Sequence, residues 1–160
     1  MKIIYRCAIL SSLVMFILSI TACNTMQLKQ EVPPGFALYA KESSTLRMIS
    51  SEGVMYRVRR VDNDPEADLA FWQKAVKTHM LDSGYIFQNE SAISARDHNG
   101  YLLTLAAPVG ASDYTYSIAL FVHKKTIILI ESAGEIAAYD KQSKNIMSLI
   151  NKTDLTKIAK

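Results

Sequence analysis

Cysteine is almost missing from this sequence of 160 residues, which holds only Cys7 and Cys23. Both lie early in the chain, so the rest has no thiol with which to form a disulfide or to ligate a metal. Histidine is scarce as well, and none of the three, His79, His98 and His123, stands at metal-ligand spacing from another ligand. We therefore expect neither a metal site nor a cofactor.

Catalytic motifs and excess charge are missing too. The sequence contains no Gly-x-Ser-x-Gly elbow, phosphate loop, dinucleotide fingerprint or His-Glu-x-x-His pattern, so no motif identifies a catalytic residue. Residues 1–22 hold two of the 18 basic residues and none of the 15 acidic ones, which leaves 16 against 15 in the remaining 138 residues. This net charge of +1 gives no reason to expect a nucleic acid partner.

An uncharged, mostly apolar run near the start of the sequence is too short for a comfortable bilayer span. It extends over residues 7–22, behind Lys2 and Arg6, whereas a transmembrane helix needs about 20 apolar residues. Basic residues followed by a short apolar run with small residues at its end are typical of a secretory signal peptide. An uncleaved signal anchor and cleavage after Ala22 by the ordinary signal peptidase are the alternatives.

The run ends in Ile20-Thr21-Ala22-Cys23, which resembles the lipobox of bacterial lipoproteins: an aliphatic residue, two small residues and the cysteine that receives the lipid. The resemblance implies that residues 1–22 are a lipoprotein signal peptide and that acylated Cys23 anchors the chain in the lipid bilayer. Two or three acyl chains anchor a protein stably, whereas a single chain binds reversibly. Asn24 replaces the aspartate that retains lipoproteins of enteric bacteria in the inner membrane. This predicts the periplasmic face of the outer membrane, if the source is Gram-negative.

The rest of the chain is long enough for one compact domain with its own core. Residues 23–35 are expected to carry the lipid and a tether, because Val32-Pro33-Pro34-Gly35 suits neither a helix nor a central strand. Residues 36–151 are expected to form a single α+β domain. A polar tail that frays, residues 152–160, is expected to follow.

Seven segments have the composition of strands. Among the turns between them, Asn99-Gly100 is the strongest two-residue hairpin signal because both residues tolerate positive φ. Residues 101–107 and 126–130 are apolar at both alternating positions, so we expect both faces of the sheet to be covered. The expected strands are 36–40, 46–50, 54–61, 85–96, 101–107, 114–123 and 126–130, with further turns at 51–53, 108–113 and 124–125.

A helix is expected from Pro65 to Ser83. Asp64 is placed to cap its free amides, and Gly84 is placed to end it. Trp72, the single tryptophan, is expected to pack in the core rather than to serve as a ligand platform. The apolar stripe that would face the sheet consists of Leu69, Trp72, Val76 and Met80.

A second helix is expected over residues 137–151, with Ser132 and Glu135 before it at capping-box spacing. Its segment Ala138-Tyr139-Asp140…Ile146-Met147-Ser148-Leu149-Ile150 is similar to the last helix of the PsbP-like family. Pro33-Pro34-Gly35-Phe36 is similar to the entry into that family's first strand, so the resemblance covers about residues 33–151. It implies an α/β/α sandwich whose antiparallel sheet has about six to seven strands. It also implies an accessory or binding role without a shared catalytic set.

The densest basic cluster is Arg57, Arg59 and Arg60. It is interpreted either as an interaction patch for an acidic partner or lipid headgroups, or as the solvated face of an edge strand. The polar pair Asp97-His98 beside the expected Asn99-Gly100 turn is explained by turn chemistry more simply than by catalysis.

Tyrosines are plentiful in the expected meander, where Tyr101, Tyr114 and Tyr116 either line a ligand groove or pack beneath a helix. The leading functional hypothesis is a membrane-anchored accessory or protein-binding module with an envelope protein as its partner. The alternative is a small-ligand carrier with a pocket between sheet and helix. A hydrolase is least favoured, because it needs histidines and acids to converge in one cleft.

Overall fold

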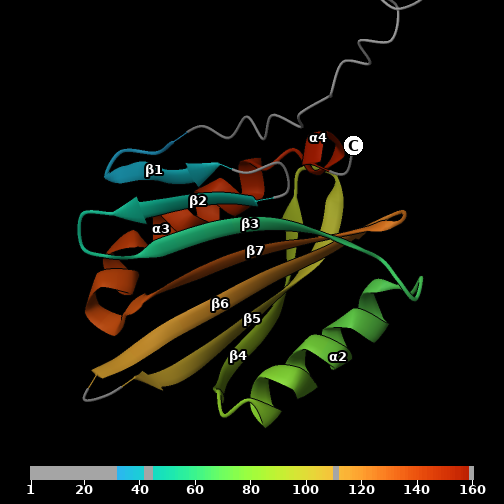
Figure 1. Cartoon of the computed structure of the whole chain (residues 1–160), viewed down its shortest axis with the longest axis horizontal. Helices are drawn as coiled ribbons and strands as arrows, with labels where there is room; N and C mark the ends of the chain where they lie inside the picture. Colours follow the sequence, from blue (N-terminus) through green and yellow to red (C-terminus); the bar gives the residue numbers. More distant parts are fainter. Residues whose placement is uncertain (1–31, 42–44, 110–111, 159–160) are drawn as a thin grey trace, which may run out of the picture.

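The computed structural model describes residues 32–41, 45–109 and 112–158, whose seven strands form one antiparallel sheet (Figure 1). The order across the sheet is β1-β2-β3-β7-β6-β5-β4, so β3 and β7 are neighbours although they are far apart in the chain. The expected signal peptide, Cys23 and Asn24 lie outside the described residues. The strands are β1 (Phe36–Lys41), β2 (Thr45–Ser50), β3 (Met55–Asp62), β4 (Ile86–Ala95), β5 (His98–Val109), β6 (Ser112–His123) and β7 (Thr126–Glu135).

Helices cover both faces of the sheet, which confirms the expected α+β sandwich. α2 (Leu69–Asp82) lies on one face against β5 and β6, and α3 (Ile136–Lys152) and α4 (Leu155–Ile158) lie on the other (Figure 1). Alternate residues of the central strands therefore enter two separate cores, and all these elements lie between residues 36 and 158. None of the helices in the described ranges is long and apolar enough to cross a membrane.

The first helix begins later than the sequence predicts. α2 starts at Leu69, and its N-cap is Asp68, whose carboxylate accepts a hydrogen bond from the Phe71 amide at 2.8 Å. The expected cap, Asp64, instead precedes a cis peptide bond to Pro65. The loop is organised by Asn63, whose buried side chain exchanges two hydrogen bonds with the Ala67 backbone and donates a third to the Lys124 carbonyl.

The hairpin between β4 and β5 turns at Arg96 and Asp97, so the prediction of a turn at Asn99-Gly100 is wrong. Arg96 takes the left-handed conformation, with φ of 51°. Gly100 lies inside β5, where a Cβ atom would come within 2.4 Å of the Phe121 ring. This glycine allows close packing on Phe121, a tertiary requirement that its local sequence does not reveal.

Two expectations for the end of the domain are also wrong. β7 runs on to Glu135, so Ser132 is a strand residue, and Glu135 caps α3 without a side-chain hydrogen bond. The segment after α3 is not a fraying polar tail, because α4 buries Leu155 and Ile158 in the core beneath α3. Asp154 accepts a hydrogen bond from Arg96 at 2.9 Å, which joins this segment to the β4–β5 turn.

Candidate functional site

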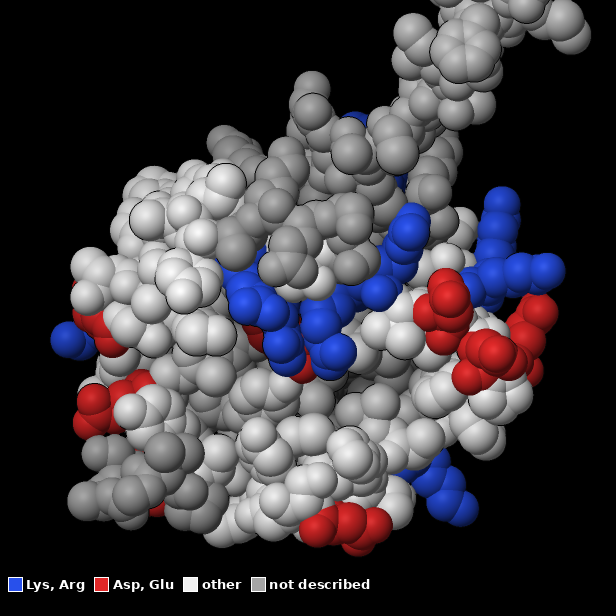
Figure 2. Space-filling model, in the orientation of Figure 1, with Lys and Arg blue, Asp and Glu red and all other residues white. Residues whose placement is uncertain are grey.

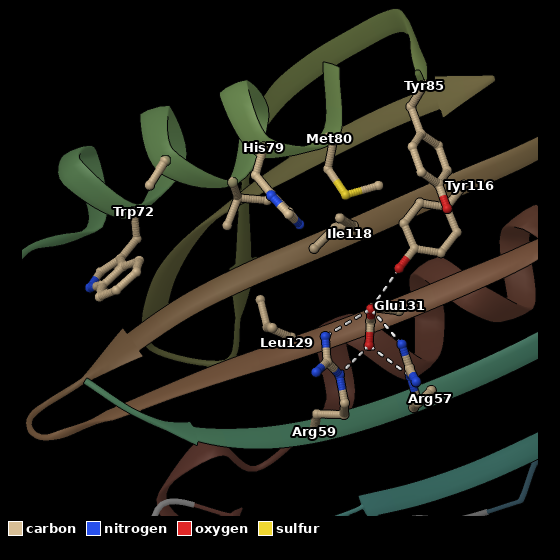
Figure 3. Close-up of a pocket in the computed structure, with 12 residues that line it drawn as sticks. Arg57, Arg59, Trp72, His79, Met80, Tyr85, Tyr116, Ile118, Leu129 and Glu131 are labelled. Carbon is tan, nitrogen blue, oxygen red and sulfur yellow. Dashed lines mark hydrogen bonds and ion pairs between the residues drawn. The ribbon is translucent and has the colours of Figure 1, made fainter. Parts of the chain in front are cut away.

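A pocket of about 460 Å³ opens between α2 and the sheet (Figure 3). It exists because α2 packs on β5 and β6, whereas no helix of the described chain covers the same face of β3 and β7 (Figure 1). There the two strands carry the charged side chains of Arg57, Arg59 and Glu131. Its walls therefore differ, being apolar near the helix and charged near β3. The lining residues are Arg57, Arg59, Trp72, Ala75, Val76, His79, Met80, Tyr85, Tyr116, Ile118, Leu129 and Glu131.

The charged wall is built on Glu131, whose side chain is 5% exposed. The register places Arg57 directly opposite Glu131, and strand alternation places Arg59 on the same face. Each guanidinium donates two hydrogen bonds to the carboxylate through Nε and Nη2, at 2.8 Å and 2.8 Å from Arg57 and at 2.8 Å and 3.1 Å from Arg59. Tyr116 donates a fifth at 2.6 Å, so the carboxylate lies between both arginines and the phenol (Figure 3).

These contacts fix the protonation of the charged wall. Burial would raise the pKa of Glu131, but the hydrogen bonds from Arg59, Arg57 and Tyr116 outweigh it and hold the pKa below the ordinary value. Burial, together with the bond to Glu131, raises the pKa of Tyr116, which therefore stays a donor. Two guanidinium groups face one carboxylate, so the cluster carries a net charge of +1.

The wall near the helix is aromatic and apolar. Trp72 is half-buried, so the expectation that it packs in the core is true only in part. Its indole Nε1 donates to Asn63 Oδ1 at 2.6 Å, which fixes the ring at one end of the pocket. The rings of Tyr85 and Tyr116 lie 5.3 Å apart at the other end. Met80 lies on α2 between Trp72 and these two tyrosines (Figure 3).

The predicted basic cluster is divided by the sheet. Arg57 and Arg59 join the pocket, whereas Arg60 falls on the opposite face by strand alternation. The edge-strand interpretation is wrong, because β3 lies between β2 and β7. Sequence reasoning did not identify Glu131, although it is the single acidic residue in the largely apolar stretch 114–132, which was a signal for it.

The three tyrosines of the expected meander lie in different places. Tyr116 lines the pocket, whereas Tyr101 is buried beneath α2 and donates to the Glu90 carboxylate. Tyr114 is half-buried at the start of β6 and does not line the pocket.

Two of the three histidines meet at the end of the sheet. His98 Nε2 and His123 Nδ1 are 3.1 Å apart, whereas His79 lies on α2 at the pocket. Among the described residues, no three His, Cys, Asp or Glu side chains gather where they could hold a metal ion. His79 and Glu131 both line the pocket, but five hydrogen bonds to Glu131 leave this carboxylate unsuited to act as a general base.

Solved structures show which proteins share this fold. No protein-family model matches the chain, and no curated protein matches it significantly in sequence. LpqN of Mycobacterium tuberculosis, involved in cell envelope biogenesis, has a TM-score of 0.61 at 9% identity over 78% of this chain and 79% of its own. PA94 of Pseudomonas aeruginosa, a protein of unknown function and putative regulator, has a TM-score of 0.54 at 11% identity over 78% and 82%. The Ran-binding protein Mog1p of Saccharomyces cerevisiae has a TM-score of 0.48 at 13% identity over 81% and 86%. At these identities the likeness to LpqN and PA94 shows the fold alone, and this chain shares their α+β sandwich.

Proposed function

We propose that this protein is a small-ligand-binding module of the bacterial envelope, anchored in the membrane through lipidated Cys23. The observation that carries the proposal is the pocket between α2 and the sheet. Its volume of about 460 Å³ falls within the range of about 300–1,000 Å³ that is usual for small-molecule sites. Its charged groups, Arg57, Arg59 and Glu131, lie on the strands β3 and β7, which hold them more firmly than loops do.

The envelope location rests on the lipobox at residues 20–23. It also agrees with the role of LpqN, a protein of the same fold that is involved in cell envelope biogenesis.

A neutral dye, N-phenyl-1-naphthylamine, tests the pocket directly. The dye is expected to gain fluorescence on binding and to quench Trp72, the single tryptophan, which lines the site. Ala75→Phe should fill the pocket from the helix side and weaken dye binding by about tenfold or more. Ala70→Phe, at an exposed position of the same helix, is the matched control. If both variants bind the dye as well as the unaltered protein does, the pocket does not bind it and the proposal is wrong.

A second candidate function, protein binding, is favoured by the edge strand β4. This strand is exposed along most of its length, including Ile86 at 55% and Phe87 at 42%. An extended segment of an envelope partner could add to such an edge by strand pairing.

Photo-crosslinking in intact envelopes tests this candidate. A photo-reactive residue in place of Ser91, an exposed position in the middle of β4, is expected to give one discrete adduct. The same residue in place of Lys141, exposed on α3, should give none. Equal labelling from both positions would count against a partner at β4.

A further inference from the structure

We infer that the ligand of the pocket is an amphipathic anion, with a carboxylate or phosphate monoester beside Arg57 and Arg59 and an apolar chain beneath α2. The inference rests on the proposed function and adds the chemical class of the ligand. It follows from the asymmetry of the pocket, in which the cationic groups lie on β3 and the apolar groups lie on α2, β6 and β7 (Figure 3).

The two arginines keep donors that Glu131 does not use. A guanidinium has five N–H donors, and Glu131 accepts from two nitrogens of each arginine. The side chains of Arg57 and Arg59 are 31% and 37% exposed, so their remaining donors are accessible to a ligand. A second anion can therefore bind without displacing Glu131. Because Glu131 already fixes both guanidinium groups, the ligand does not have to order them.

A third guanidinium strengthens the positive field. Arg47 of β2 lies directly opposite Arg57 of β3, and like charges on directly opposite residues repel each other. Arg47 Nε is buried without a hydrogen-bond partner in the part of the chain that the structure describes. The four charged groups of Arg47, Arg57, Arg59 and Glu131 therefore sum to +2. An anionic group close to them would offset their repulsion.

The surface of the protein shows the same polarity. Lys and Arg side chains gather over β2 and β3, and a hollowed, uncharged surface leads from them towards α2 (Figure 2). A cationic ligand is disfavoured by this charge, and an inorganic anion would leave the apolar wall unused. That wall consists of Trp72, Val76, Met80, Ile118 and Leu129.

Calorimetric titration with four ligands of equal chain length tests the inference. They are octanoate, octyl phosphate, 1-octanol and octylammonium. The protein without residues 1–23 is suitable, because both cores and all described elements lie between residues 36 and 158. Octanoate and octyl phosphate are expected to bind about tenfold or more tightly than octanol, as charge-assisted hydrogen bonds require, and octylammonium should bind most weakly. The tighter of the two anions identifies the acid group.

Two variants locate the anion. Arg59→Gln is expected to weaken octanoate binding by about tenfold and to change octanol binding by less than about threefold. Lys125→Gln, which removes one positive charge at the exposed tip of the β6–β7 hairpin, should leave both affinities unchanged. If Arg59→Gln fails to fold, the comparison of ligands on the unaltered protein still decides the question.

Each contrary outcome has its own meaning. If octanol binds as tightly as octanoate while the neutral dye still binds, the proposed function stands and the anionic class is wrong. If inorganic phosphate binds as tightly as octyl phosphate, the apolar wall contributes nothing and the amphipathic class is wrong. If neither the dye nor any of the four ligands binds, both proposals fall.

Discussion

Replacement of Glu131 by alanine is expected to lower the free energy of unfolding by about 3 kcal/mol, the lower end of the range for breaking a buried ion pair. Five hydrogen bonds end on this carboxylate, and its loss leaves Arg57 and Arg59 without their anion. The lower end applies because both arginines are about one third exposed and can turn towards water. Urea unfolding followed by circular dichroism measures the change.

Glu135→Ala is the matched control, since Glu135 lies four residues further along β7, is exposed and makes no capping hydrogen bond. It should change the free energy of unfolding by no more than about 0.5 kcal/mol. Equal losses from the two variants would mean that the charged wall contributes nothing specific to stability.

The same variant should show a distinct pH dependence. The pKa of Glu131 lies below its ordinary value of 4.5 in the folded protein, so the unfolded chain binds this proton first as the pH falls. The stability that the carboxylate contributes is therefore present above pH 4.5 and is lost as the pH falls through the folded pKa. The difference in stability between the unaltered protein and Glu131→Ala should shrink over that range. A difference that is constant with pH would contradict the depressed pKa.

Hydrophobic patterning predicted the strands and the two-sided sheet because it reflects burial directly. The apolar run 126–130, for example, fills both cores, with Ile128 and Ile130 on one face and Ile127 on the other. The apolar residues at both alternating positions of this short segment were therefore enough to predict that β7 lies between two helical layers.

Local signals failed where tertiary contacts decide the backbone. Gly100 carries a strong turn signal, yet Phe121, which comes 21 residues later, requires it in a strand. Asp64 carries a capping signal, yet Asn63 binds the loop to Lys124 and delays the helix to Leu69. Such contacts cannot be read from a window of neighbouring residues.

Only part of the candidate site could be predicted from the sequence. The sequence singled out Arg57, Arg59 and Tyr116, but not their common partner. Glu131 is 74 residues from Arg57 in the chain, and only the pairing of β3 with β7 brings the two together. The pocket itself depends on how much of the sheet α2 covers, which composition and spacing do not determine.

Cys23→Ala is expected to abolish labelling with radioactive palmitate completely and to leave an unprocessed precursor that keeps residues 1–22. In the lipobox interpretation the Cys23 thiol is the nucleophile that takes the diacylglyceryl group, and alanine offers no substitute. Without two or three acyl chains the domain has no stable lipid anchor. Gel electrophoresis of labelled cells measures both the label and the size of the chain.

Cys7→Ala provides the matched control for that experiment, because Cys7 lies within the segment that would be removed. The Cys7 variant should be labelled and processed like the unaltered protein. The two variants should therefore differ completely, with full palmitate labelling of Cys7→Ala and none of Cys23→Ala. Labelling that persists in Cys23→Ala would refute the lipidation site.

In a Gram-negative host, Asn24 predicts that the processed protein fractionates with the outer membrane. Recovery with inner-membrane markers would overturn that location, while the anchor at Cys23 would still stand.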